Sequence, residues 1–242
     1  METPAETPAG MQDVRRDEGR QYALPLVIRV DRAAPPTRTD ALEGAARAVL
    51  AFLSDPRVTA VDGEWAAAAR AWEDARIRKV VRRARGAAWD RAGALPGITV
   101  RHGSAEIRVY PPVPVDDWPA DLARLQVSGT DFDDPVPPAE PAAGTPVLWM
   151  NPGLPMTAGK AMAQAGHGAQ LAWWGLSPRG RGEWLDRDFD LAVRVAGREQ
   201  WADLLASGLP VVTDGGFTEV APGSATLVAD LPSLRAATGR PG

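Results

Sequence analysis

The sequence contains no cysteine, and it has only two histidines among its 242 residues. Without cysteine there can be no disulfide and no thiol nucleophile, and this composition is typical of a cytoplasmic protein. The two histidines, His102 and His167, are far apart in the sequence and do not form a metal-binding set with one another. We therefore expect no metal site.

Several familiar sequence patterns are missing as well. The chain has no GxGxxG or P-loop pattern for nucleotides and no GxSxG pattern for a nucleophilic serine. It also has no run of eighteen apolar residues, so we expect no membrane span. The first twenty residues are polar and contain proline, which predicts a disordered tail and not a signal peptide. We expect no cofactor and a cytoplasmic location.

The chain contains two divergent copies of one pattern. LPLVIRV at 24–30 and TPVLWMN at 145–151 are apolar segments that each predict a buried strand. In both halves a long helix, a segment flanked by tryptophans and two further strands follow in the same order. We expect a disordered tail over 1–20, a degenerate first unit over 21–115, a linker over 116–144 and a second unit over 145–235.

Each unit is predicted to be an α/β/α sandwich with a mixed sheet. In the linker, 116–129 predicts a short helix, and the acidic, proline-rich stretch from 130 to 144 predicts an extended chain. Segment 76–85 is ambiguous, because its apolar residues have helical spacing whereas the alignment of the two halves favours a strand.

Two segments of the second unit combine polar side chains in a way that suggests a site. GKAMAQAGHG at 159–168 predicts a helix that carries Lys160, Gln164 and His167 on one face. DGGFTEVAPGS at 214–224 predicts a strand end followed by a glycine-rich loop. Together these segments supply the ammonium, carboxylate and hydroxyl groups of a small hydrolytic site.

These two segments resemble the signature of the archaeal/eukaryotic-type peptidyl-tRNA hydrolase family. The matching residues are Gly159, Lys160, Ala163, Gln164, His167, Asp214, Gly216, Thr218, Pro222, Gly223 and Ser224. The resemblance covers roughly 146–232 and implies hydrolysis of the ester bond between peptide and tRNA, with peptidyl-tRNA as the partner. Family members are homodimers of one such unit, so two units in one chain imply a monomeric pseudo-dimer.

The resemblance implies catalytic roles for Lys160, Asp214, Thr218 and His167. Lys160 would stabilise an oxyanion or hold a phosphate, Asp214 would orient Lys160 or a water, and Thr218 would present its hydroxyl to water or the ester. His167 lies about 10 Å along the helix from Lys160 and would position substrate. The alternatives are a turn-capping aspartate, a loop hydroxyl and a structural histidine.

Other residues are expected to bind the substrate. They are Gln164, Gly216, Pro222, Gly223 and Ser224 around the site, and Arg82, Arg83 and Arg85 from the densest positive cluster of the chain. The net charge of −4 means that any tRNA binding must come from a local patch such as this cluster. The alternative for the cluster is a solvated charged face.

A second function remains open. The segment NPGLPMTA at 151–158 carries no charge where the family has cations. This difference favours a catalytically inactive module of the same fold that binds tRNA or protein.

Overall fold

The structure, a computed structural model, describes residues 19–216 and 220–238. Most of the tail expected over 1–20 lies outside the described residues. The elements of the first half are β1 (Tyr22–Arg29), α2 (Arg38–Ser54), α3 (Pro56–Thr59), α4 (Ala66–Glu73), β2 (Arg78–Ala84), α5 (Ala87–Gly93), β3 (Ile98–His102), β4 (Ala105–Val109), β5 (Val113–Pro114) and α6 (Ala120–Ala123). Those of the second half are β6 (Val147–Met150), α7 (Ala158–Gly175), α8 (Pro178–Asp186), β7 (Ala192–Val195), α9 (Arg198–Leu205), β8 (Val211–Thr213), β9 (Ala225–Asp230) and α10 (Pro232–Thr238).

The two halves contain sheets with the same arrangement of four strands, to which the first sheet adds the short β5, paired antiparallel with β1. The first sheet has the order β2-β1-β4-β3, in which β1 is parallel to β2 and antiparallel to β4. The second has the order β7-β6-β9-β8, in which β6 is parallel to β7 and antiparallel to β9. The expected α/β fold with two tandem units and mixed sheets is confirmed. Strands β6, β7, β8 and β9 correspond to β1, β2, β3 and β4.

The register corrects the alignment of the first strands by one residue. Leu26 lies opposite Val109, and Leu148 lies opposite Ala229. When 105–112 is aligned with 225–232, Leu26 therefore corresponds to Leu148, whereas the alignment of the apolar segments matched it with Val147. A strand that is buried on both faces has no alternation of polar and apolar residues from which the sequence can fix its register.

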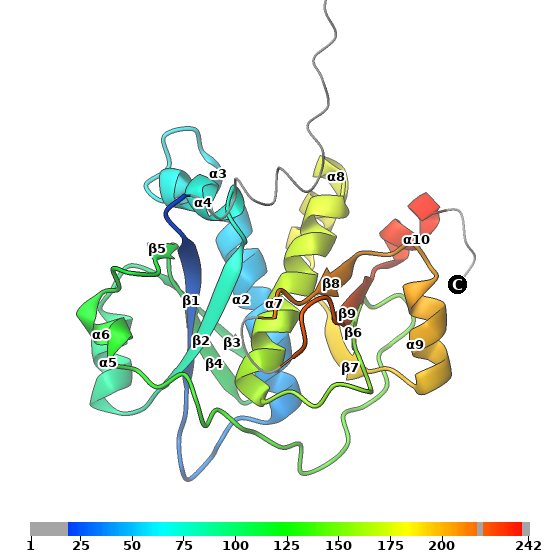
Figure 1. The fold of residues 1–242 in the computed structure, drawn as a ribbon, viewed down its shortest axis with the longest axis horizontal. Helices are drawn as coiled ribbons and strands as arrows, with labels where there is room; N and C mark the ends of the chain where they lie inside the picture. The colour runs from blue at the N-terminus through cyan, green and yellow to red at the C-terminus, as the bar shows by residue number, and fades with distance from the viewer. Residues whose placement is uncertain (1–18, 217–219, 239–242) are drawn as a thin grey trace, which may run out of the picture.

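The molecule is layered, as Figure 1 shows. Helices α5 and α6 cover the outer face of the first sheet, α9 and α10 lie on the outer side of the second sheet, and α2 and α7 occupy the space between the sheets. The central helices carry many fully buried small side chains, Ala41, Ala45 and Ala48 of α2 and Ala161, Ala165 and Ala169 of α7, and they meet at Gly166 of α7, where a Cβ would lie 2.9 Å from Val49 Cγ2 of α2. Small residues allow two helices to pack at short distance. The two units therefore share one core.

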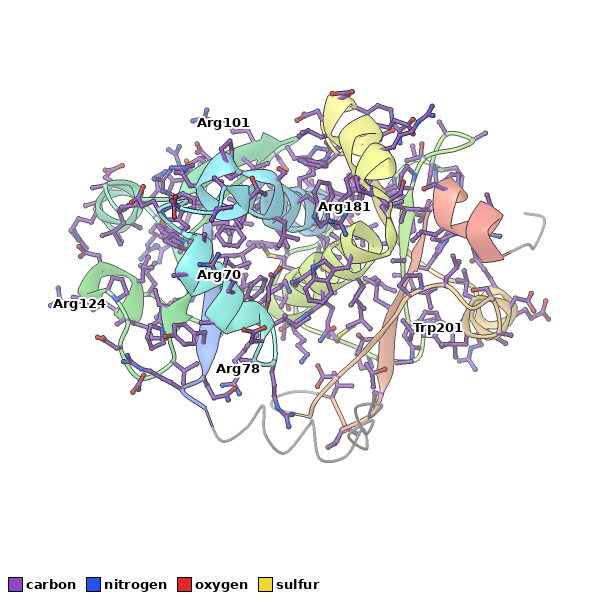
Figure 2. All side chains as sticks on the ribbon, turned by 90° about the horizontal axis from the view of Figure 1, so that it is seen from above. Arg70, Arg78, Arg101, Arg124, Arg181 and Trp201 are labelled. Carbon is purple, nitrogen blue, oxygen red and sulfur yellow. The ribbon has the colours of Figure 1, made fainter. Side chains whose placement is uncertain are left out.

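Side chains fill the space around the central helices, as the view from above shows (Figure 2). In that view Arg101 and Arg124 project from the first unit, and Trp201 of α9 lies on the other side of the molecule. Within the described part of the chain, no helix is both long enough and apolar enough to cross a membrane.

The segments that the sequence left open are also defined. Segment 76–85 forms strand β2, as the alignment of the halves favoured. In the linker, the helical part is short, α6, and 130–144 contains neither helix nor strand. The linker covers the edge strands of both sheets: the Arg83 N–H donates to the Gln126 carbonyl, and the Arg194 side chain donates to the Ala139 carbonyl.

Candidate functional site

The Asp214 carboxylate lies against the first half of α7. Asp214 directly follows β8, and its Oδ2 accepts hydrogen bonds from Lys160 Nζ and, at 2.7 Å, from Gln164 Nε2. Its Oδ1 accepts the Gly216 N–H at 2.8 Å. The residue is 7% exposed. The polar helix face and the loop that the sequence singled out therefore meet in one cluster.

Thr226 extends this cluster, and the sequence analysis did not include it. Its hydroxyl donates to Gln164 Oε1 at 2.8 Å, which leaves the amide nitrogen of Gln164 directed at Asp214. Thr226 is completely buried on β9. The sequence could have indicated Thr226, because it is a hydroxyl residue within the apolar strand ATLVAD and a buried polar side chain needs a hydrogen-bond partner.

Backbone hydrogen bonds join the two ends of the loop after β8. The Asp214 N–H donates to the Ser224 carbonyl at 2.9 Å, and the Gly223 N–H donates to the Asp214 carbonyl at 2.8 Å. Gly216 has a φ of 77°, and a Cβ there would lie 2.3 Å from Pro222 Cγ. Gly216, Pro222, Gly223 and Ser224 thus shape the loop that holds Asp214. Thr218 lies outside the described residues.

Lys160 occupies the first turn of α7. The Thr157 hydroxyl caps this helix by accepting the Lys160 N–H, and the Gly159 N–H donates to the Thr130 carbonyl at 3.2 Å. A cation near a helix N-terminus is unfavourable, and the ion pair with Asp214 offsets this cost. Among the described residues the Lys160 ammonium bonds only Asp214, and the side chain is 13% exposed. Its other protons are therefore available to a ligand.

His167 contacts the first unit and not Asp214. Its Nδ1 lies 3.1 Å from Lys79 Nζ of β2, and Lys79 also donates to Gln170 Oε1 at 2.5 Å. Burial, followed by the cations Lys79 and Lys160, lowers the pKa of His167 well below its ordinary value. Burial also lowers the pKa of Lys79, against the opposing effect of Glu73. His167 is therefore a neutral ring that accepts a hydrogen bond across the contact between the units.

The three arginines of the positive cluster have different environments. Arg82 donates to the Leu125 carbonyl at 2.6 Å and lies over the Trp118 ring. Arg83 donates to Gln126 Oε1. The Arg83 guanidinium also lies close to Gly129, since a Cβ there would be 3.2 Å from it. Gly129 precedes Thr130, whose carbonyl bonds the Gly159 N–H at the start of α7. Arg85 is exposed. Since neighbouring side chains of a strand point to opposite faces, Arg83 lies on the side of α7 and Arg82 on the other.

Within residues 19–216 and 220–238, no three His, Asp or Glu side chains are grouped as they would be to hold a metal ion. No protein-family model, no curated protein and no solved structure matches this chain.

Proposed function

We propose that the chain hydrolyses the ester bond between peptide and tRNA. The observation that carries this proposal is the Lys160–Asp214 ion pair at the start of α7. The Asp214 carboxylate is fixed by hydrogen bonds from the Gln164 amide and from the Gly216 N–H of the loop after β8. It combines a mostly buried cation with a fixed carboxylate, and resemblance to the peptidyl-tRNA hydrolase motifs adds the substrate class.

In the proposed mechanism, Lys160 stabilises the negative charge that develops on the ester carbonyl oxygen when water attacks. Such a group accelerates acyl transfer when it is already in place before the charge forms. Asp214 Oδ2 and Gln164 keep Lys160 in place. Asp214 Oδ1 accepts one hydrogen bond among the described residues and so keeps an acceptor position that orients the attacking water. The ester C–O bond then breaks: the proton that the attacking water loses passes by way of Asp214 to the ribose oxygen, so the tRNA leaves with a free hydroxyl and the peptide leaves as a carboxylic acid.

The substrate of this proposal is peptidyl-tRNA, bound by a monomeric pseudo-dimer. Arg83 and Arg85 supply positive charge on the first unit, and Arg83 lies close to the start of α7. Peptidyl-tRNA is a cytoplasmic molecule, so the proposed activity takes place in the cytoplasm.

The test is incubation with an N-acetylated aminoacyl-tRNA, with release of free tRNA as the readout. We expect Lys160→Met and Asp214→Asn each to lower kcat/KM at least about tenfold, which is about 1.4 kcal/mol of activation free energy. Asp203→Asn on the exposed face of α9 is the matched control and should keep the wild-type rate.

Two outcomes would contradict the proposal. One is a folded Lys160→Met variant with the wild-type rate. The other is a wild-type protein that binds the aminoacyl-tRNA without releasing tRNA, which would identify the chain as the non-catalytic binding module.

A further inference from the structure

A cavity of about 550 Å³ lies where β6 and β7 end. Its apolar lining comes from Pro138 of the linker, Leu42 of α2, Trp149 and Met150 of β6, and Val193 and Val195 of β7. Leu42 belongs to the first unit, whereas Trp149, Met150, Val193 and Val195 belong to the second, so the cavity requires both units. Lys160 and Asp214 are not among the residues that line it.

The charged side chains around the cavity balance one another. Two arginines, Arg38 and Arg194, face two carboxylates, Asp134 and Glu140. Arg194 donates to Glu43 at 2.7 Å and to the Ala139 carbonyl at 2.8 Å, so its donors are already engaged. A phosphate would meet two carboxylates here and find little free positive charge. This balance disfavours a nucleotide or the tRNA backbone as the occupant.

The polar groups around the apolar lining suit an amide chain. Arg38 keeps N–H donors besides the one that bonds the Met156 carbonyl, the side-chain amide of Gln200 carries further donors, and Glu140 carries an acceptor. The backbone N–H and C=O of Val195 add a further donor and acceptor. The Val193 N–H points away from β6 and bonds Glu43, and because strand orientation repeats every two residues, the backbone groups of Val195 also point away from β6. The Val195 side chain is 66% exposed. Donors and acceptors around an apolar surface match the alternating groups of an extended peptide.

The cavity and Asp214 lie on the same side of the second sheet, where the parallel strands β6, β7 and β8 have their carboxyl ends. In the order β7-β6-β9-β8, Asp214 follows the end of β8, and the cavity is at the ends of β6 and β7. Three strand spacings of about 4.8 Å separate β8 from β7, which is about 14 Å. An extended peptide rises about 3.3 Å per residue, so about four residues span this distance.

We infer that this cavity binds the peptide part of the substrate, at an apolar residue about four positions from the ester. The inference rests on the proposed function, and it assigns the peptide part of the substrate to a cavity that residues of both units line. It predicts that hydrolysis becomes more efficient as the peptide lengthens from one residue to about four.

The experiment compares an N-acetylated aminoacyl-tRNA with an N-acetylated tetrapeptidyl-tRNA of apolar residues. Two variants of the full chain alter the cavity: Val195→Asp adds a charge at its exposed edge, and Gly197→Leu fills it. A Cβ at Gly197 would meet only Gln200, at 3.9 Å or more, so the fold accommodates the substitution. Val61→Asp, at a valine that is 86% exposed in the first unit and does not line the cavity, is the control.

We expect both cavity variants to lower kcat/KM for the tetrapeptidyl-tRNA about tenfold, leaving the aminoacyl-tRNA and the control unchanged. Equal effects on both substrates, or none on either, would overturn the inference while leaving the proposed function intact.

A second measurement does not depend on turnover: fluorescence anisotropy of a dye-labelled, uncharged apolar tetrapeptide added to each protein. Absence of wild-type binding up to millimolar protein, or equal binding by Gly197→Leu, would overturn the inference even if neither tRNA is hydrolysed.

Discussion

Glu43 of α2 joins the helix of the first unit to the sheet of the second. Its carboxylate accepts hydrogen bonds from His102 Nε2 at 2.7 Å, from Arg194 at 2.7 Å and from the Val193 N–H at 3.1 Å. Burial by itself would raise the pKa of Glu43, but these hydrogen bonds outweigh it and hold the pKa below its ordinary value. A single buried carboxylate thus satisfies the outward-facing Val193 N–H at the edge of β7.

A lowered pKa makes Glu43 a source of pH-dependent stability. Above the ordinary glutamate pKa of about 4.3 its contribution is complete, and it is lost as the pH falls through the lower folded-state value. We expect Glu43→Gln to lower the free energy of unfolding by about 2 kcal/mol at pH 7. The loss of stability below pH about 4.3 should then be shallower than in the wild type.

Urea unfolding between pH 2 and 7, followed by circular dichroism, measures both effects. Glu199→Gln on the exposed surface of α9 is the control. A Glu43→Gln variant with the wild-type midpoint at pH 7 would show that the edge contact contributes no stability.

At the scale of elements, α7 both carries the candidate site and packs against the other unit. Its first turn holds Lys160, its next turn holds Gln164, and Gly166 faces the first unit. A Cβ at Gly166 would lie 2.9 Å from Val49 Cγ2 and 3.2 Å from Lys79 Cδ. Glycine at this position allows α2 and β2 to approach α7 closely.

This close approach predicts opposite outcomes for two helical glycines. Gly166→Leu should destabilise the protein by about 1–3 kcal/mol, because the added side chain meets the branched Val49 and the stem of Lys79 in a packed interface. Gly182→Leu in α8 has open space around the new Cβ and should stabilise slightly through helix propensity. Thermal unfolding of both variants is the measurement, and a Gly166→Leu variant as stable as Gly182→Leu would contradict the packing argument.

At the scale of the whole molecule, the two units have the same topology but different polar contacts. Arg38 corresponds to Lys160 at the start of the central helix, yet its guanidinium donates to the Met156 carbonyl at 2.9 Å and lines the cavity. The first unit therefore supports the second and contributes to the cavity, while the Lys160–Asp214 cluster belongs to the second unit.

The shared core makes a prediction about the isolated second unit. A fragment from 143 to 242 would expose the apolar surface of α7 that packs on α2 around Gly166 and Val49. We expect this fragment to self-associate or aggregate, because an exposed apolar surface of this kind favours association. Size-exclusion chromatography with light scattering measures the association, with the full chain as reference, and a stable monomeric fragment would contradict the shared core.

The sequence by itself determined the features that depend on local periodicity. Apolar runs predicted the strands, the small residues of 159–168 predicted a helix, and helical spacing placed Lys160 and Gln164 on one face of it. The glycine and proline pattern after Asp214 predicted its loop. The repeated order of segments also indicated two similar units.

Only the tertiary structure decided which side chains meet across long separations. Asp214 accepts from Gln164, Thr226 orients that amide, and His167 pairs with Lys79 of the other unit. Arg82 and Arg83 are separated because segment 76–85 is a strand, whose alternation places neighbours on opposite faces. The cavity likewise requires α2, the linker and β7 to converge. Periodicity shows which face a residue occupies, but the packing of helices and sheets determines what that face touches.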